Sequence, residues 1–152
     1  MMKNSASDNR GRAEQVAALP WRLDSKGKLR ILLVTSRTNG KWMLPKGWPM
    51  DGKSPSEAAQ IEAREEAGVE GEVSDNAIGS FRYIKLFGDG TSTHAQALVY
   101  PVRVTSVLPQ WDEKHQRSRN WLRPKKAAEM VFEPDLRRFL LALRDESLVL
   151  FD

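Results

Sequence analysis

The chain of 152 residues contains no cysteine, so it has neither disulfide bonds nor a thiolate metal site. It also lacks any apolar run that approaches the length of a membrane span. The first twelve residues, MMKNSASDNRGR, do not contain the apolar core of a secretion signal. These absences give no sign of export or of a membrane partner, and they predict a cytoplasmic protein.

The composition is that of a globular chain, with 40% apolar and 29% charged residues. The length suits one domain with a single hydrophobic core. We expect residues 1–13, which are mostly small and polar, to be a flexible tail, and residues 14–152 to form the domain. The net charge of +4 and the pI near 9.5 favour an anionic partner, although a solvated basic surface explains them equally well.

A helix from Pro55 to Ala67 has the clearest boundaries in the sequence. Ser54 is a favourable N-cap, and Pro55 suits the first helical position because its missing N–H would have no helical partner. Glu57 completes a capping box with Ser54. At the other end, Gly68 can adopt the left-handed conformation that ends a helix. Local sequence therefore predicts both ends of this helix.

The other segments follow the order strands, helix, strands, helix. Between the first two strand-like segments, 24–27 reads DSKG, which is turn chemistry and predicts a hairpin. The expected strands are 15–23, 28–36, 77–87, 93–107 and 121–122, the further expected helices are 124–130 and 134–144, and segments 46–53 and 111–119 are expected to be loops. This order predicts an α/β fold with a mixed sheet flanked by helices.

Three glutamates, Glu62, Glu65 and Glu66, lie at positions i, i+3 and i+4 of the predicted helix and project within one narrow sector. Like charges at this spacing repel, and the helix dipole disfavours anions near the C-terminal end. Taken alone, such a cluster is more often a solvated face. Here small and apolar residues flank the sector and polar residues gather opposite it. This pattern favours a sector that faces a cleft and binds a divalent cation through oxygen ligands.

The segment 47–69 reads GWPMDGKSPSEAAQIEAREEAGV and resembles the Nudix box, which joins glycines, a helix and acidic residues at fixed spacing. The matching positions are Gly47, Glu62, Ala63, Glu65, Glu66, Gly68 and Val69. The upstream LLVTSR resembles a strand of relatives that act on diphosphoinositol polyphosphates and dinucleoside polyphosphates. The resemblance to the MutT-like Nudix hydrolases covers roughly residues 14 to 145, and it implies an α/β/α sandwich with a mixed sheet.

Two positions depart from the box. Lys53 stands where the family has its first glutamate, and Ile61 stands where the family has an arginine. The family arginine helps to orient an acidic residue of the box, and Arg64 lies on the other side of the helix and cannot simply replace it. We therefore expect the departures to affect the catalytic rate and the ligand set rather than to abolish activity.

The resemblance also implies a mechanism. Glu62, Glu65 and Glu66, with the backbone carbonyl of Gly47, would bind one or more magnesium ions, with manganese as the alternative ion. A glutamate would take the proton of the attacking water, with Glu65 as the first choice for this general base and Glu62 as the second.

Outside the box, Arg37 and Lys46 are the preferred candidates for binding substrate phosphates. Arg37 ends the LLVTSR strand and Lys46 precedes the box glycine, so both can reach the mouth of the site. Glu113 is a weaker candidate, for which we prefer an exposed position in a loop. For three further basic residues we also prefer an exposed surface position, namely Arg22, Arg82 and Lys85.

The leading hypothesis is a metal-dependent pyrophosphohydrolase that cleaves a phosphoanhydride bond in a phosphate-rich small molecule, of the diphosphoinositol polyphosphate or dinucleoside polyphosphate type. Another nucleoside diphosphate derivative, such as a sugar nucleotide, is a second enzymatic possibility. The alternative is a non-catalytic Nudix-like module that binds nucleotides or RNA, which the two departures and the basic balance support. No helix-turn-helix or aromatic-interleaved basic motif indicates nucleic acid as the main partner. The sequence leaves the oligomeric state open.

Overall fold

The computed structural model describes residues 12–143, and residues 1–11 and 144–152 lie outside the described part of the chain. The described residues form strands β1 to β8 and helices α1 to α3. The strands are β1 (Arg12–Leu23), β2 (Leu29–Thr35), β3 (Trp42–Met43), β4 (Lys46–Gly47), β5 (Val69–Val73), β6 (Gly79–Leu86), β7 (Ser92–Val107) and β8 (Arg119–Leu122). The helices are α1 (Pro55–Ala67), α2 (Pro124–Met130) and α3 (Pro134–Leu141).

Strands β1 and β2 form the predicted hairpin, with Trp21 opposite Ile31. The turn is held by Asp24, whose carboxylate accepts the backbone N–H groups of Lys26 and Lys28 at 2.9 Å each. Gly27 has a φ of 77°, a conformation that glycine adopts without a steric penalty. Local turn chemistry therefore sets the register of this pair.

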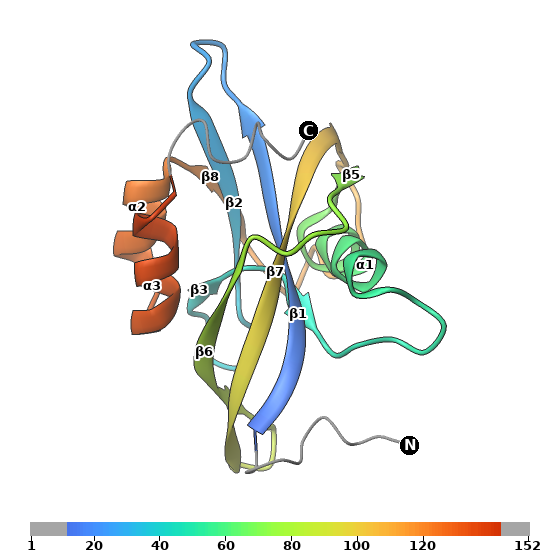
Figure 1. Ribbon diagram of the computed structural model, residues 1–152, viewed down its shortest axis with the longest axis vertical. Coiled ribbons are helices and arrows are strands. Elements are labelled where there is room, and N and C mark those ends of the chain that lie inside the picture. Colours follow the sequence, from blue (N-terminus) through green and yellow to red (C-terminus); the bar gives the residue numbers. More distant parts are fainter. Residues whose placement is uncertain (1–11, 144–152) are drawn as a thin grey trace.

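All the strands belong to one mixed sheet (Figure 1). Strand β1 pairs antiparallel with β2 and β4, and it pairs parallel with β7. From there the sheet extends through β2 to β3 and β8, and through β7 to β5 and β6. Helix α1 covers one side of the sheet, and α2 and α3 cover the other. This arrangement confirms the predicted α/β/α sandwich with a mixed sheet.

The sheet divides the hydrophobic core into two parts. Leu33 points toward the part under α2 and α3, together with Leu140, whereas its neighbour Leu32 points toward the part under α1. This alternation follows from the pleat of β2. On the α1 side, buried alanines such as Ala59 and Ala63 let the helix pack close to the sheet. The acidic residues of the same helix are thereby held close to β4.

Helix α1 has the predicted bounds. The Ser54 hydroxyl accepts the backbone N–H of Glu57, and the Glu57 carboxylate accepts the backbone N–H of Ser54 at 2.8 Å, so the capping box is complete. Gly68 ends the helix in the left-handed conformation, with φ 67° and ψ 36°. Both predicted caps are confirmed, and they determine where the helix begins and ends.

Some segments differ from the sequence prediction. Strand β5 follows α1 directly and was not predicted, because Glu70, Gly71 and Glu72 give no apolar alternation. Strand β4 lies in a segment predicted to be a loop, where two residues pair with β1. Strand β8 begins at Arg119, earlier than predicted, and α3 ends at Leu141. These short edge elements depend on tertiary pairing rather than on local pattern.

The predicted tail over residues 1–13 stays a prediction, because residues 1–11 lie outside the described part of the chain and β1 already includes Arg12. Among the helices of the described residues, none is long and apolar enough to cross a membrane. The predicted end of α3 at Arg144 also lies outside the described residues.

Candidate active site

The acidic residues of α1 face β4. Glu66 is buried, with a relative exposure of 5%, and its Oε1 accepts the backbone N–H of Lys46 at 3.2 Å. The carboxyl groups of Glu62 and Glu66 share a hydrogen bond. The Glu62 carboxylate lies against Gly47, where the Cβ of any other residue would collide with it. Glycine at residue 47 therefore leaves the space that the Glu62 carboxylate occupies.

Burial and crowding perturb both carboxyl groups. Burial raises the pKa of Glu62 to about 8, and the neighbouring charges of Glu66, Glu65 and Glu113 act in the same direction. Burial also raises the pKa of Glu66, although the Arg117 guanidinium opposes this shift. At neutral pH the pair therefore holds a proton that a bound cation could displace.

These residues fit a magnesium ion. Two carboxylates and the backbone oxygen of Gly47 are hard ligands, and magnesium in proteins takes one or two carboxylates beside water and substrate phosphates. Glu65 is half-buried, and its charge acts on Glu62. Within residues 12–143, no three acidic or histidine side chains form a ready-made metal cluster. The pair of Glu62 and Glu66 is thus the preassembled part of the predicted ligand set.

Two residues of the loop between β7 and β8 complete the acidic site. The Arg117 side chain is only 5% exposed, and its Nε donates to Glu113 Oε1 at 2.6 Å. Its Nη2 lies 3.5 Å from Glu66 Oε2. The preference for an exposed Glu113 was therefore wrong, because its side chain is 18% exposed and is held in this network. The sequence did not predict a role for Arg117, because nothing in the segment 114–119, KHQRSR, indicates which basic residue is buried.

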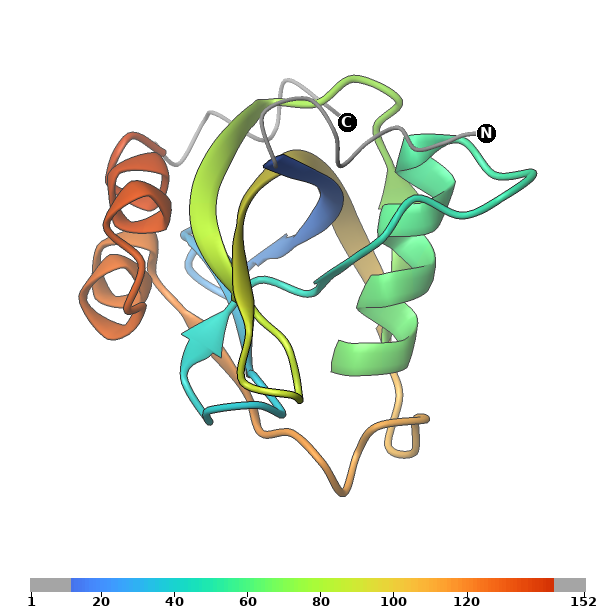
Figure 2. The ribbon, with the colours of Figure 1, turned by 90° about the horizontal axis from the view of Figure 1, so that it is seen from below.

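The same loop docks on the C-terminal end of α1, as Figure 2 shows. The last carbonyls of a helix lack helical partners. Here the backbone carbonyl of Glu65 accepts a hydrogen bond from the backbone N–H of Glu113 at 3.1 Å. The backbone carbonyl of Glu66 accepts one from Trp111 Nε1 at 3.1 Å. The Ala67 oxygen accepts Arg119 Nη1 at 2.9 Å. The C-terminal end of α1 is thereby fixed to the loop. The positive charge of Arg119 interacts favourably with the negative end of the helix dipole.

Lys46 and Arg37, the two candidates for phosphate binding, lie on different sides of the network that joins Glu66, Arg117 and Glu113. The Lys46 ammonium is 4.6 Å from the centre of the Tyr83 ring and 3.2 Å from Met43 Sδ, and burial lowers its pKa to about 8. Arg37 is more exposed, at 55% of its side chain, and donates to Gln116 at 3.0 Å. Lys46 is thus half-buried and contacts the acidic pair through its backbone N–H, whereas Arg37 lies at the surface near Glu113.

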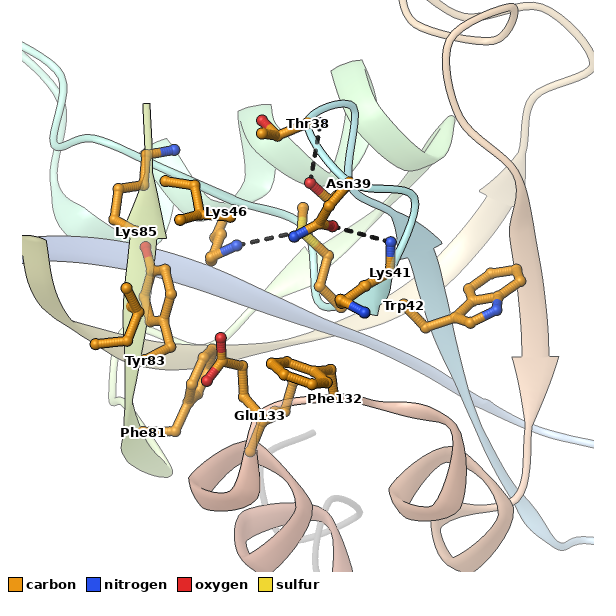
Figure 3. A pocket seen from close by; sticks show the side chains of 15 residues that line it. Thr38, Asn39, Lys41, Trp42, Lys46, Phe81, Tyr83, Lys85, Phe132 and Glu133 are labelled. Carbon is orange, nitrogen blue, oxygen red and sulfur yellow. Dashed lines mark hydrogen bonds between the residues drawn. The ribbon is translucent and has the colours of Figure 1, made fainter. Parts of the chain in front are cut away.

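A pocket opens next to Lys46, between β3, β6 and the segment that joins α2 to α3 (Figure 3). Its wall includes Tyr83 and Lys85, and the Lys41 ammonium lies 4.3 Å from the centre of the exposed Phe132 ring. Three lysines from different elements thus line one cavity together with aromatic rings. Lys85 belongs to this wall, so the preference for a plain surface position was wrong for it.

Other singled-out residues lie away from the acidic pair. Arg82 is exposed on the other face of β6, and Arg22 stacks on Trp121 with its guanidinium 4.0 Å from the ring centre. Lys53 is exposed in the turn before α1, and Ile61 is half-buried. Neither departure from the box therefore places a new charge among the acids.

Comparisons with known proteins identify the family of this chain. Residues 13–143 match the family profile of the NUDIX domain. Nudix hydrolase 17, mitochondrial, of Arabidopsis thaliana is 34% identical over 128 residues, which cover 80% of this chain and 68% of that protein. Diphosphoinositol polyphosphate phosphohydrolase 2 of Rattus norvegicus is 27% identical over 126 residues, covering 82% and 65% of the two chains.

Among solved structures, the C. elegans Ap4A hydrolase in a binary complex superposes with a TM-score of 0.64 at 18% identity, covering 90% of this chain and 96% of that one. At this identity the superposition supports the fold. The family match covers most of the described residues and includes the acidic helix, the box glycine and β4. The chain therefore belongs to the Nudix hydrolases, enzymes that act on acid anhydrides in phosphorus-containing compounds.

Proposed function

We propose that this chain is a magnesium-dependent pyrophosphohydrolase of a phosphate-rich small molecule, of the diphosphoinositol polyphosphate or dinucleoside polyphosphate type. The observation that carries the proposal is the hydrogen-bonded pair of Glu62 and Glu66 over Gly47, next to the half-buried Lys46. Such a pair is unfavourable in isolation, because two carboxylates share a site with little solvent. A cation and the phosphates that it carries would relieve this cost.

In this proposal the carboxylates of Glu62, Glu65 and Glu66 and the carbonyl of Gly47 hold the ion. When bound, magnesium neutralises phosphate charge and lowers the pKa of a coordinated water. Glu65, half-buried at the edge of the acidic pair, accepts the proton of the attacking water. Glu62 is the second choice for this role.

The pocket beside Lys46 supports the substrate class. The ammonium groups of Lys41, Lys46 and Lys85 surround it and can bind several phosphate groups at once. The exposed ring of Phe132 lies over Lys41 at the same pocket, where a base or a sugar ring can pack. We therefore favour a substrate with phosphates on more than one position over a single nucleoside diphosphate.

The test is release of phosphate from a panel of dinucleoside polyphosphates, diphosphoinositol polyphosphates and nucleotide sugars, with magnesium, with manganese and with EDTA. We expect hydrolysis to require the added metal. Glu65→Gln and Glu66→Gln should each lower kcat about 100-fold or more, the effect of removing a general base or an essential ligand. The matched control is Glu129→Gln, at an exposed glutamate on α2 whose side chain is 58% exposed, which should keep wild-type rates.

Full activity of Glu65→Gln and Glu66→Gln would refute the assigned site. Absence of release from every substrate, together with tight binding of RNA, would instead support the non-catalytic module that Lys53 and Ile61 suggest.

A further inference from the structure

In the described ion pairs, no basic side chain of α1 contacts the acidic pair of Glu62 and Glu66. Ile61 stands at the position of the family arginine, and Arg64 is exposed and pairs with Glu70 at 3.1 Å. A carboxylate that must accept a metal in one orientation needs partners that hold its oxygens. These partners must therefore come from other elements of the fold.

The two oxygens of Glu66 have different partners. Oε1 accepts the backbone N–H of Lys46, which is fixed by β4, and Oε2 faces the guanidinium of Arg117 at 3.5 Å. The carboxylate is thus held from two directions, and its plane is determined by a strand on one side and by the β7–β8 loop on the other.

Arg117 is itself held rigidly. Its Nη1 donates to the carbonyl of Thr35 at 2.9 Å, its Nε donates to Glu113, and only 5% of its side chain is exposed. Because the guanidinium is planar and its Nε and Nη1 groups both have fixed acceptors, it is held in one orientation. Arg117 therefore connects the end of β2, the loop acid Glu113 and the helix acid Glu66.

Loop docking alone does not explain this arrangement. The loop and the start of β8 are already attached to the C-terminal end of α1 and its cap Gly68 by the backbone N–H groups of Leu108 and Glu113 and by the side chains of Trp111 and Arg119. In the described hydrogen bonds, all of these groups donate to backbone carbonyls and none donates to the carboxylate of Glu62 or Glu66. Arg117 is placed where it orients carboxylates.

We propose that Arg117 is a positioning residue for the metal-binding carboxylates, supplying from the β7–β8 loop the orientation that the position of Ile61 cannot supply. The inference rests on the proposed function, because it concerns the same acidic pair. It also makes Glu113 part of the site, as the acid that fixes the Nε side of the guanidinium.

The experiment compares Arg117→Met and Arg117→Lys with the wild type. Binding of Mn²⁺ to the full chain without substrate is measured by electron paramagnetic resonance, and kcat and KM are measured separately. Loss of a group that orients a metal ligand typically weakens affinity or activity by about 10- to 100-fold. We expect this range for the Mn²⁺ Kd and for kcat in Arg117→Met, with KM changed by less than about threefold. Arg117→Lys keeps the charge without the planar fork, so it should lie between Arg117→Met and the wild type.

Millimolar guanidinium or ethylguanidinium ion should restore part of the activity of Arg117→Met and have no effect on the wild type. Two matched controls separate orientation from folding. Arg119→Met removes a side chain at the start of β8 that donates to backbone carbonyls and stacks on the Trp111 ring, so it should lower the unfolding temperature while leaving the Mn²⁺ Kd within about threefold. Arg64→Met removes an exposed arginine of the same helix and should change neither quantity.

Wild-type Mn²⁺ affinity and kcat in Arg117→Met, with Glu66→Gln inactive, would overturn the proposal and leave the proposed function intact. Failure of the proposed function gives a different result, in which Glu66→Gln also binds Mn²⁺ and turns over substrate like the wild type. If Arg117→Met does not fold, as judged by circular dichroism, Arg117→Lys decides, and wild-type affinity in that folded variant would overturn the proposal.

Discussion

Glu62 and Gly47 meet across the narrow space between α1 and β4, and the absence of a side chain at residue 47 makes room for the carboxylate. The glycine is not in a left-handed conformation, so its role is steric and not conformational. What an added methyl group would strike is the far end of a flexible side chain. The folded backbone can therefore tolerate the change, whereas the position of the carboxylate cannot.

Gly47→Ala should accordingly lower activity much more than stability. We expect a loss of about 100-fold in kcat, because a displacement of roughly 1 Å in a positioned group has effects of this size. Phosphate release and urea denaturation of the same preparation check both parts. Gly88→Ala is the matched control, since an added Cβ there meets nothing within 4 Å and should leave both quantities unchanged. Equal activity of the two variants would contradict the assigned role of Gly47.

At this scale the sequence predicted the helical placement of Glu62, Glu65 and Glu66, because their spacing is a local property of one helix, and their roles stay predictions. It did not predict Arg117, and it placed Glu113 wrongly at the surface. Both belong to a loop whose position depends on contacts with the distant end of α1. No pattern within the loop distinguishes the buried base from its exposed neighbours.

Among the elements, α1 shows how completely local signals can determine a helix. Its N-terminal capping box and its left-handed end at Gly68 were both predicted, and the observed bounds are the predicted ones. The contacts of its C-terminal end were not predictable. A Cβ at Gly68 would lie 2.5 Å from the Trp111 ring and 2.7 Å from Arg119 Nη1, so this glycine serves both the helix end and the docked loop.

Gly68→Ala should therefore destabilise the protein more than Gly27→Ala. Both glycines have positive φ, for which alanine costs about 1–2 kcal/mol. Nothing lies within 4 Å of an added Cβ at Gly27, so this conformational cost is the whole effect there. At Gly68 the collision with the loop adds to it, and we expect a total of about 3 kcal/mol or more in the free energy of unfolding. Denaturant titration of both variants measures the difference, and equal losses would show that the loop yields freely.

The long strands β6 and β7 were predicted, and the strands β4 and β5 were missed, for the same physical reason. Strands β6 and β7 carry enough alternating or apolar residues to be recognised locally, whereas β4 has two residues and β5 has three polar or small residues in its centre. The pairing of these short strands is decided by neighbouring strands. The sequence therefore predicted the sandwich and its layers, but it did not predict which short segments complete the sheet.

For the molecule as a whole, the buried acidic pair links folding to pH. The pKa of Glu62 is about 8 in the folded state, compared with 4.5 in the unfolded chain. Between these two pH values the folded protein therefore binds more protons than the unfolded chain. The contribution of Glu62 to stability is complete below pH 4.5 and is lost as the pH rises through 8. Burial of Lys46, whose pKa is lowered from 10.5 to about 8, has the opposite slope, but only above pH 8.

We expect the metal-free protein, prepared with EDTA, to lose unfolding free energy between pH 5 and pH 8, and Glu62→Gln to show a flatter profile over the same range. Magnesium binds the deprotonated carboxylates, so it should stabilise the wild type more at pH 8 than at pH 5. Urea titrations at several pH values, with and without magnesium, provide the measurement. Parallel profiles for the wild type and Glu62→Gln would contradict the raised pKa of this carboxyl group.

The parallel pairing of β1 with β7 has a consequence for how the chain assembles. Arg12 lies opposite His94 and Trp21 lies opposite Arg103, so the first strand finds this partner about 80 residues later in the chain. During synthesis, β1 can form its hairpin with β2 early, but its other edge stays open until β7 has left the ribosome. Contacts of such long sequence separation slow folding and prolong the exposure of an unpaired strand edge. Helix α1 lies between these two strands in sequence, so it is synthesised before the pairing of β1 with β7 can form.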